Sequence, residues 1–340
     1  MEVAIEERIY RLPSPIRTAN GELTERRTLI IRLTDEEGRT GHGEAAPLEP
    51  YDGVSLQEAA DALERYAGVL TAARGRSGAD LVRACRRVAD LPQALAAVDV
   101  ALWDLAGNRS GKPVAALLAA APADRVPVNA TIGAPSPEEA AEEARRAAAG
   151  AGFRCVKVKV GVGDDVARVA AVREAVGPEV ALRLDANGAW TVEQAVATIR
   201  ELAEHDLELV EEPVSGAAAL RAVREQVAPV RIALDESASD QGALASGCAD
   251  AVCLKLSRVG GIGELLEQAR LARTFGLDVY LASTFEGPIG IAAAVHCAAA
   301  LGIELPCGLA TLPLLGIDNV LQARNGWIAV PDGPGLGIDL

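Results

Sequence analysis

The stretch Cys155-Val-Lys-Val-Lys-Val-Gly161 sets the pattern that the middle of the chain repeats. Read as a β-strand, it places Lys157 and Lys159 on the same face as Cys155, with three valines on the opposite face. Such alternation is typical of an edge strand that has one face in water. Similar strands recur here with helical segments between them, and this order predicts a parallel sheet with both faces covered.

Charged residues end the strands that follow. The segments Ala181–Asp185, Ile232–Asp235 and Val252–Lys255 alternate apolar and polar residues, and Glu211 ends another strand between them. In a β/α barrel the catalytic groups lie at the carboxyl ends of the strands, on the inner face. We therefore interpret five charged residues as one site: Lys159, Asp185, Glu211, Asp235 and Lys255.

Three of these residues predict a metal site. Asp185, Glu211 and Asp235 are separated by 26 and 24 residues (211−185 and 235−211), about one β/α unit each, so their strands are neighbours. Three carboxylates at adjacent strand ends need a cation in a low-dielectric site, and an all-oxygen set suits Mg²⁺, with Mn²⁺ as a substitute. The alternatives are three unrelated surface acids, or ligands at the adjacent Glu212 and Glu236.

Lys159 and Lys255 lie four strands apart, so they are expected to face each other across the barrel mouth. A lysine beside Mg²⁺ and a second ammonium group has a lowered pKa and can act as a general base near neutral pH. The alternative is that one of the two is only a counter-ion for a carboxylate.

The whole chain has 340 residues, a net charge of −15 and 50% hydrophobic residues. Its acidity argues against nucleic acid and anionic membranes as partners. The six cysteines lack metal-type spacing such as Cys-x-x-Cys and are expected to be buried, reduced thiols. With no visible signal peptide, the sequence predicts a cytoplasmic protein, with self-association into a homo-oligomer left open.

Two domains are expected: an α+β capping domain over residues 1–125, and a (β/α)₇β barrel of the TIM type over residues 126–319. A hairpin at 28–33 and 41–45 and helices at 56–70 and 92–107 belong to the cap, and residues 320–340 return to it. The first barrel strand is predicted at 126–132 and the eighth at 303–309. Capping patterns at Ser136 and Thr191 predict two helix starts, and a short strand at 327–330 is expected to return to the cap. Two loops with Pro and Gly, 13–21 and 48–53, are expected to close over the barrel mouth.

In this order the motifs Lys-Val-Lys, Asp-Ala-Asn, Glu-Glu-Pro and Asp-Glu-Ser, with Lys255 before Gly260-Gly261, resemble the enolase superfamily and its muconate-lactonizing subgroup. The turn at residues 43–47 is similar to that family's capping domain. Within the subgroup, the segments 183–190 and 307–313 are most similar to o-succinylbenzoate synthases. Dipeptide epimerases carry an Asp-x-Asp pair on the eighth strand, whereas this segment is uncharged. Leu256 and the Ser283-Thr284-Phe285 run depart from the synthase pattern.

The resemblance implies a small-molecule carboxylate as the substrate of a Mg²⁺-dependent syn dehydration in menaquinone biosynthesis, in which Lys159 removes the α-proton and returns it to the leaving hydroxyl. Lys255 would supply positive charge while the metal stabilises an enediolate. The expected substrate contacts are Lys157, Asn187, Ser283, Glu286, Gly308 and Leu309.

Within the same superfamily the alternatives are an N-acylamino acid racemase, a dipeptide epimerase or a muconate-type cycloisomerase. A Schiff-base aldolase would leave the three carboxylates unexplained, and a catalytically idle barrel that only binds a ligand would not need all five charged residues.

Overall fold

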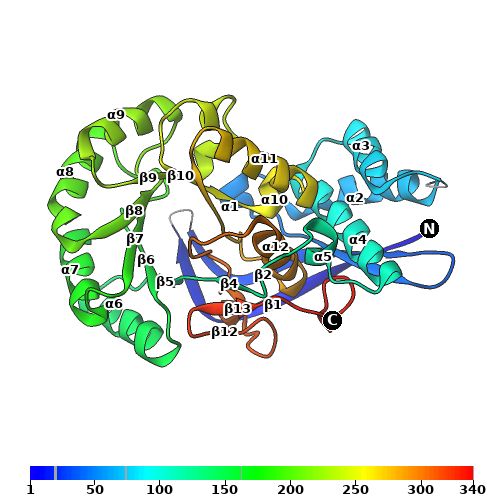
Figure 1. Ribbon diagram of the computed structural model, residues 1–340, viewed down its shortest axis with the longest axis horizontal. Helices are drawn as coiled ribbons and strands as arrows, with labels where there is room; N and C mark the ends of the chain where they lie inside the picture. Colours follow the sequence, from blue (N-terminus) through cyan, green and yellow to red (C-terminus); the bar gives the residue numbers. More distant parts are fainter. Residues whose placement is uncertain (19–20, 73–74, 162, 340) are drawn as a thin grey trace.

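The computed structural model describes residues 1–18, 21–72, 75–161 and 163–339. A cap of antiparallel strands and helices lies beside a barrel of alternating strands and helices (Figure 1). This is the architecture that the alternation of strand and helix patterns predicts. Among the described residues no helix is both long and apolar enough to cross a bilayer.

The cap begins with a three-stranded antiparallel sheet of β1 (Glu2–Thr18), β2 (Gly21–Thr34) and β3 (Thr40–Ala45), in the order β1-β2-β3. The predicted hairpin joins β2 to β3, and the Asp35 carboxylate accepts hydrogen bonds from the turn amides of Glu37 and Arg39, both at 2.9 Å. Five helices follow: α1 (Glu49–Asp52), α2 (Leu56–Thr71), α3 (Gly78–Val88), α4 (Pro92–Ser110) and α5 (Val114–Leu118).

The two segments predicted as loops of the cap are regular structure. Residues 13–18 continue β1 and pair with β2 after a register shift, so that Thr18 faces Gly21. The tip of this predicted loop, residues 19–20, lies outside the described residues. Residues 49–52 form the short helix α1, which ends at Gly53 in the left-handed conformation. Prolines and glycines in these segments mark a bulged strand and a helix end instead of irregular loops.

The cap sheet packs closely on α4 because β3 carries Gly41 and Gly43. A Cβ atom at Gly43 would lie 1.8 Å from the carbonyl oxygen of Ala97, and one at Gly41 would lie 2.2 Å from that of Ala101. Neither contact involves a flexible side chain, so the strand or the helix would have to move.

Replacing Gly43 by alanine is therefore expected to destabilise the cap by at least about 3 kcal/mol, because the new methyl group overlaps helix backbone. Gly68 provides the matched control, since it lies within α2 and a Cβ there meets nothing within 4 Å. Gly68→Ala is expected to raise stability by about 0.5–1 kcal/mol through helix propensity. Denaturant unfolding of both variants checks this, and equal midpoints for the two would contradict it.

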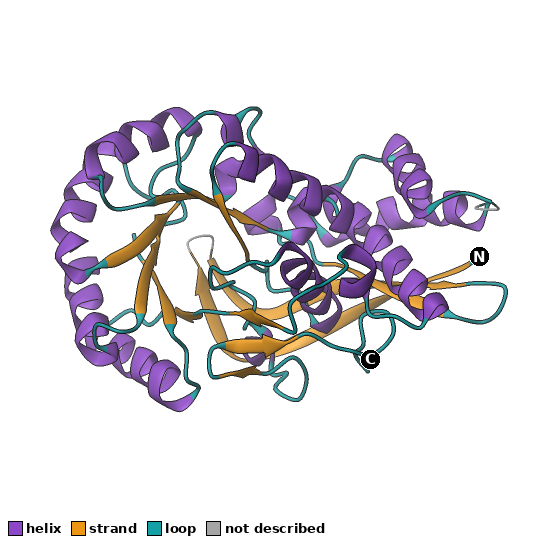
Figure 2. Ribbon diagram, in the orientation of Figure 1, coloured by secondary structure: helices purple, strands orange, loops and turns teal. Residues whose placement is uncertain are grey.

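The barrel is built on a seven-stranded parallel sheet in the order β11-β10-β9-β8-β7-β6-β5, with helices around its outside (Figure 2). The strands are β5 (Ala130–Ile132), β6 (Cys155–Lys159), β7 (Ala181–Asp185), β8 (Leu207–Glu211), β9 (Ile232–Leu234), β10 (Ala251–Leu254) and β11 (Asp278–Leu281). The helical segments are α6 (Pro137–Arg145), η1 (Arg146–Gly150), α7 (Asp165–Val176), α8 (Val192–Leu202), η2 (Ala203–His205), α9 (Ala217–Val227), η3 (Glu236–Ser239), η4 (Ala243–Ala245), α10 (Leu256–Val259), α11 (Ile262–Thr274), α12 (Pro288–Leu301) and η5 (Leu312–Leu315).

The eighth strand, predicted at 303–309, is reduced to two isolated parallel bridges. Cys307 pairs with Val128 and Gly308 pairs with Ala282, which joins the two edges of the sheet. The predicted first strand is likewise divided into β4 (Arg125–Pro127) and β5, because the chain changes partners at Val128, whose amide donates to Gly326.

The C-terminal strand has a different partner from the one expected. β13 (Trp327–Ala329) pairs antiparallel with β4 and with β12 (Ala323–Arg324). It therefore pairs with the segment that precedes β5 and is not part of the cap sheet. The chain then reaches the cap helices: the amide of Leu336 donates to Asp104 at 2.7 Å, and the Gly335 carbonyl accepts from Val114 at 2.8 Å.

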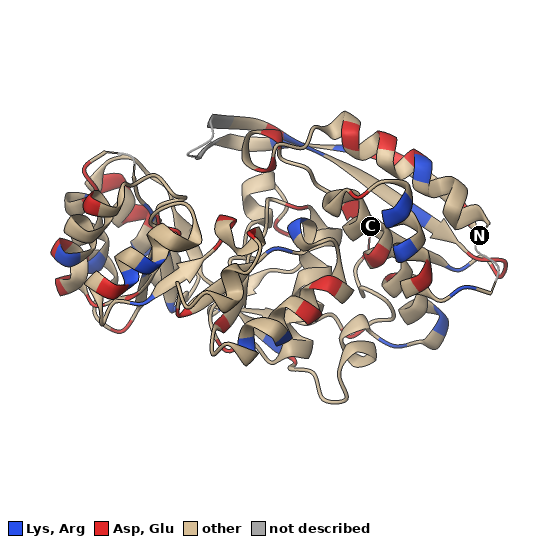
Figure 3. Cartoon of the chain, turned by 90° about the horizontal axis from the view of Figure 1, so that it is seen from above, with Lys and Arg blue, Asp and Glu red and all other residues tan. Residues whose placement is uncertain are grey.

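The side-chain alternation of β6 follows the predicted pattern. Val156 and Val158 belong to the apolar layer between strands and outer helices, while the two lysines point to the interior of the barrel. Both predicted helix starts form, since Ser136 accepts from the Glu139 amide and Thr191 makes a full capping box with Gln194. Acidic and basic positions are interspersed along the outer helices (Figure 3).

Candidate active site

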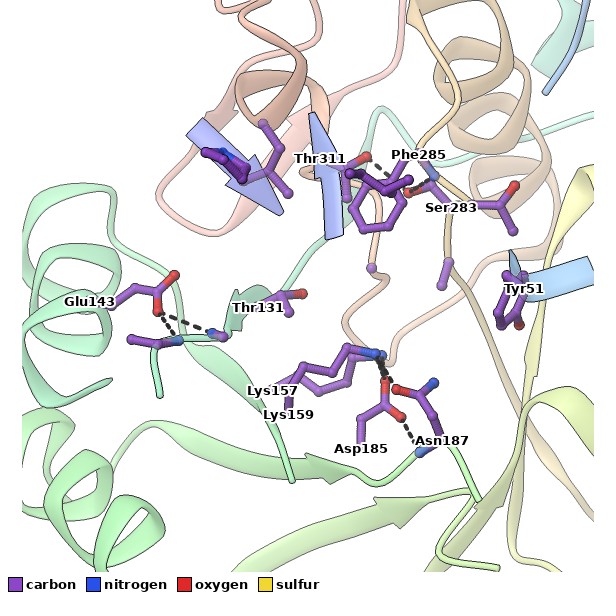
Figure 4. Close-up of a pocket in the computed structure, with 18 of the residues that line it drawn as sticks. Tyr51, Thr131, Glu143, Lys157, Lys159, Asp185, Asn187, Ser283, Phe285 and Thr311 are labelled. Carbon is purple, nitrogen blue, oxygen red and sulfur yellow. Dashed lines mark hydrogen bonds and ion pairs between the residues drawn. The ribbon is translucent and has the colours of Figure 1, made fainter. Parts of the chain in front are cut away.

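Two lysines of β6 lie against the carboxylate that ends β7. The Lys159 ammonium donates to Asp185 at 2.6 Å and to Asn187 at 2.8 Å. Lys157, two residues earlier on the same face, lies 2.8 Å from Asp185 and also donates to both oxygens of Glu211, at 2.9 and 3.1 Å. Lys157, Lys159, Asp185 and Asn187 form one group in the cavity (Figure 4).

The second cluster lies at the end of β10. The ammonium of Lys255 forms an ion pair with Asp235, with its Nζ 2.5 Å from Oδ1. The same ammonium contacts the hydroxyl of Tyr51 at 2.6 Å and lies 4.7 Å from the centre of its ring. Tyr51 belongs to α1, so the cap supplies a direct contact to a barrel lysine, and Arg258 lies against the same ring at 5.1 Å.

The alternation of the strands decides which acid of each adjacent pair faces the interior. Glu211 accepts from the hydroxyl of Tyr280 at 2.7 Å and from Lys157. Glu212 turns away and accepts from the amides of Asp235 and Ser237, at 2.8 and 3.1 Å, and burial raises its pKa to about 7. Glu236 accepts from the side chain of Asn187 at 3.0 Å.

The charged groups of the site strongly shift one another's pKa values. Burial alone would raise the pKa of Asp185, but Lys157 and Lys159 outweigh it and keep that pKa below its usual range. Burial, followed by the neighbouring charge of Asp185, raises the pKa of Glu211. Burial opposes the charged form of Lys255, but Asp235 more than compensates and raises its pKa well above the usual value. This direction is opposite to the lowered lysine pKa expected from the sequence, because that expectation includes the positive charge of a metal ion beside the lysine. Each buried charge therefore depends on an opposite charge beside it.

The carboxylates are suitable ligands for a hard cation. Asp185, Glu211 and Asp235 are at most 6% exposed and end β7 and β8 or directly follow β9, which are neighbours in the sheet. In the register of these strands Lys159 faces Asp185, and Asp185 faces Glu211. Oxygen donors at adjacent strand ends match the ligand preference of Mg²⁺. Among the described residues, Glu211 and Asp235 have oxygens in one group of ligand atoms within 4.8 Å, and Asp185 lies outside that group.

A cavity of about 840 Å³ opens at this end of the barrel. Four of the six expected substrate contacts line it: Lys157, Asn187, Ser283 and Gly308. Residues that the sequence reasoning did not select also line it, among them Tyr51, Thr131, Phe285 and Thr311. The cap closes one side through Ser14, Pro15 and Leu23 of the hairpin and Leu48 and Pro50 beside α1, and movement of these segments over the substrate stays a prediction.

Glu286 and Leu309 lie outside the residues that line this cavity. Glu286 is buried and accepts from the Ser257 hydroxyl at 2.8 Å and from the Thr284 amide at 2.6 Å, so it stabilises the segment after β11. Leu309 is fully buried in the apolar layer of the barrel. The residue after Gly308 therefore points away from the cavity, as strand alternation requires.

Removing the Tyr51 hydroxyl is expected to affect the two lysines unequally. Tyr51→Phe keeps the ring over Lys255 but loses the 2.6 Å contact with its ammonium, whereas Lys159 keeps all its partners. From the role of a general base that the sequence predicts for Lys255, proton transfer through this lysine is expected to slow about 10-fold, within the range for a lost hydrogen bond to a charged group. Solvent deuterium exchange on each enantiomer of a substrate measures this. Equal slowing on both enantiomers would contradict a role through Lys255.

Comparison with known proteins places this geometry in a family. Residues 1–119 match the mandelate racemase/muconate lactonizing enzyme N-terminal domain, and residues 139–340 match the enolase C-terminal domain-like family. The hydrophobic dipeptide epimerase of Enterococcus faecalis is 33% identical over 96% of both chains. The solved structure of the dipeptide epimerase from E. faecalis V583, complexed with Mg and the dipeptide L-Leu-L-Tyr, superposes with a TM-score of 0.92 at 31% identity, covering 100% of this chain and 99% of that one.

Two further relatives differ in activity. The o-succinylbenzoate synthase of Thermobifida fusca is 47% identical over 223 residues, but the match covers only 59% of this chain and 68% of that enzyme. The N-succinyl Arg/Lys racemase of Bacillus cereus superposes with a TM-score of 0.88 at 25% identity, covering 100% of this chain and 96% of that one.

The chain is an enzyme of the enolase superfamily. Within that superfamily it belongs to the branch defined by mandelate racemase and muconate lactonizing enzyme, whose two domains it carries.

Proposed function

We propose that this enzyme interconverts the two configurations at the α-carbon of an N-acylated amino acid. The observation that carries the proposal is the position of two lysines in one cavity, Lys159 from β6 and Lys255 from β10, with Asp185 and Asp235 beside them. Inversion needs one base to take the α-proton on one face and one acid to return a proton on the other. Two lysines four strands apart meet that requirement.

Mg²⁺ is the cofactor we propose, with Asp185, Glu211 and Asp235 as its ligands. When bound, the ion would supply positive charge that stabilises the anion left by the departing α-proton. The substrate carboxylate would be directed to this end of the cavity, which places the α-carbon between the lysines. Lys157 is the less suitable base, because its ammonium lies between two of the proposed metal ligands, Asp185 and Glu211, whereas that of Lys255 pairs with only one, Asp235.

The wall near the eighth strand favours an acyl group over a free ammonium group. Ser283, Gly308 and Thr311 line this side, and residues 307–311 include no carboxylate. An ammonium group would lose its hydration here without gaining a counter-charge from this segment. This segment argues for an N-acylated amino acid over a free dipeptide. Four glutamates within residues 138–143 also line the cavity, and full-length relatives include dipeptide epimerases, so a free dipeptide belongs in the same substrate panel.

Syn dehydration to o-succinylbenzoate is the second candidate. The 47% identity to the T. fusca synthase and the uncharged eighth-strand segment favour it. Against it stands the partial coverage of that match, while epimerases match almost the whole length. In a dehydration Lys159 would both remove the α-proton and protonate the leaving hydroxyl, and Lys255 would supply only charge.

A substrate panel separates these candidates. Purified enzyme with Mg²⁺ is supplied with N-acetyl and N-succinyl amino acids, with free dipeptides, and with the hydroxy acid precursor of o-succinylbenzoate. Chiral chromatography and ultraviolet absorbance follow the products. We expect the kcat/KM for racemisation of the N-acylated compounds to be at least about 10-fold above that for free dipeptides. The reason is that the ammonium group of a free dipeptide would be buried without a counter-charge beside the eighth-strand segment. Faster turnover of the hydroxy acid would favour dehydration as the main activity.

A further inference from the structure

The thiol of Cys253 lies next to two of the proposed metal ligands. One carboxylate oxygen each of Glu211 and Asp235 and the Sγ atom of Cys253 lie within 4.8 Å of one another. All three residues are buried, with exposed fractions of 0%, 6% and 2%. They come from β8, from the end of β9 and from β10, which are consecutive in the sheet.

Strand geometry directs this thiol into the barrel. Cys253 precedes Lys255 by two residues and therefore shares its inward face, and it pairs in register with Tyr280, whose hydroxyl contacts Glu211. Among the described residues, the thiols of Cys155, Cys248 and Cys307 donate hydrogen bonds, to Glu208, Ala243 and Leu305. The described residues give no hydrogen bond for the thiols of Cys85, Cys253 and Cys297, and of these three only the sulfur of Cys253 lies beside the two carboxylates.

We propose that Glu211, Asp235 and Cys253 form a second, overlapping site that takes a thiophilic divalent cation such as Zn²⁺ or Cd²⁺. Thiolate sulfur selects such ions, whereas Mg²⁺ prefers oxygen ligands alone. Ligand atoms around a tetrahedral zinc ion lie about 3.5 Å apart, so the three atoms, which lie within 4.8 Å of one another, need to approach by at most about 1.3 Å. On binding, the S–H bond breaks, the sulfur–metal bond forms, and the proton leaves to solvent.

The overlap has a functional consequence that rests on the proposed Mg²⁺ site. Glu211 and Asp235 are needed by both ions, so a thiophilic cation would exclude Mg²⁺ and leave Asp185 with its two lysines. Zn²⁺ would therefore inhibit in competition with Mg²⁺ instead of replacing it as a cofactor. The sulfur site itself depends only on the positions of three side chains and not on the reaction.

Cadmium provides the test, because a cadmium–thiolate bond has a charge-transfer band in the ultraviolet. Metal-free protein is titrated with Cd²⁺ alone, without substrate. We expect one equivalent to produce the band, Cys253→Ser to abolish it and to weaken Cd²⁺ binding at least about 10-fold, and saturating Mg²⁺ to lower the apparent Cd²⁺ affinity. Cys248→Ser is the matched control and is expected to keep the band, since that buried thiol lies outside the site.

The spectra of the wild-type protein and of two Cys253 variants decide whether sulfur is a ligand. A Cd²⁺ complex without a thiolate band, or with the same band in Cys253→Ser or Cys253→Ala, would overturn the sulfur ligand. Unchanged Cd²⁺ affinity in saturating Mg²⁺ would overturn the shared carboxylates. Because the band is read without turnover, failure of the proposed reaction leaves this result interpretable.

Discussion

Replacing Lys159 or Lys255 by alanine is expected to lower the racemisation rate by about 10⁴-fold or more, because each lysine serves one face of the α-carbon. The two variants should differ in the enantiomer on which they retain α-proton exchange. Each should retain α-proton exchange on the enantiomer whose proton faces the surviving lysine and lose it on the other. Nuclear magnetic resonance in deuterated buffer, with each enantiomer supplied separately, measures both effects.

Lys255→Arg separates proton transfer from charge. Arginine keeps a positive charge beside Asp235 and Tyr51 but does not act as a base at neutral pH. For racemisation it should be almost as impaired as alanine, whereas a dehydration that needs only charge there should recover in part. Substantial racemisation by Lys255→Arg would contradict the two-base account. Thermal unfolding of each variant should show that the barrel remains folded.

Removal of divalent metal is expected to abolish activity. Asp185, Glu211 and Asp235 lie buried together, and stabilisation of the anionic intermediate needs more charge than the lysines provide. A chelator should reduce turnover by at least about 10³-fold, with recovery on addition of Mg²⁺ or Mn²⁺. Full activity in protein shown by elemental analysis to be metal-free would contradict the assignment.

Asp235→Asn extends this test to one ligand. The amide keeps the size of the side chain, but it weakens the site for cations and removes the ion pair of Lys255. The variant should need a higher Mg²⁺ concentration, by about 10- to 100-fold, for half-maximal activity. Its affinity for Mg²⁺ by calorimetry gives a readout that is independent of turnover.

Much of the fold is predictable from local patterns. The alternation in β6 gives the inward direction of its lysines, and the capping residues at Ser136 and Thr191 begin helices where expected. The long strand β1 was not predicted, because its pairing with β2 continues through a bulge in a segment with two prolines. The eighth strand is reduced to two bridges, of Cys307 with Val128 and of Gly308 with Ala282. A strand pattern in the sequence does not identify these partners. The division between cap and barrel near residue 125 remains a proposal.

The site residues that end successive strands were predictable from the sequence. Contacts between side chains that are far apart in the sequence were not. Carboxylates at successive strand ends indicate a shared site, but Tyr51 contacts Lys255 across 204 residues of sequence. Cys253 could have been noticed, since it lies two residues before Lys255 on the same strand face. Glu286 was expected to contact substrate, yet its carboxylate accepts hydrogen bonds from Thr284, two residues earlier, and from Ser257, which comes near it only in the folded chain.

Deuterium incorporation by the wild-type enzyme tests the two-base account most directly. Each enantiomer of an N-acylated amino acid is incubated in deuterated buffer with Mg²⁺, and mass spectrometry with chiral separation follows the α-position. The account predicts that both enantiomers react, and that the opposite enantiomer appears carrying deuterium from solvent. Rapid dehydration of the hydroxy acid by the same preparation, with no deuterium entering either enantiomer, would contradict it.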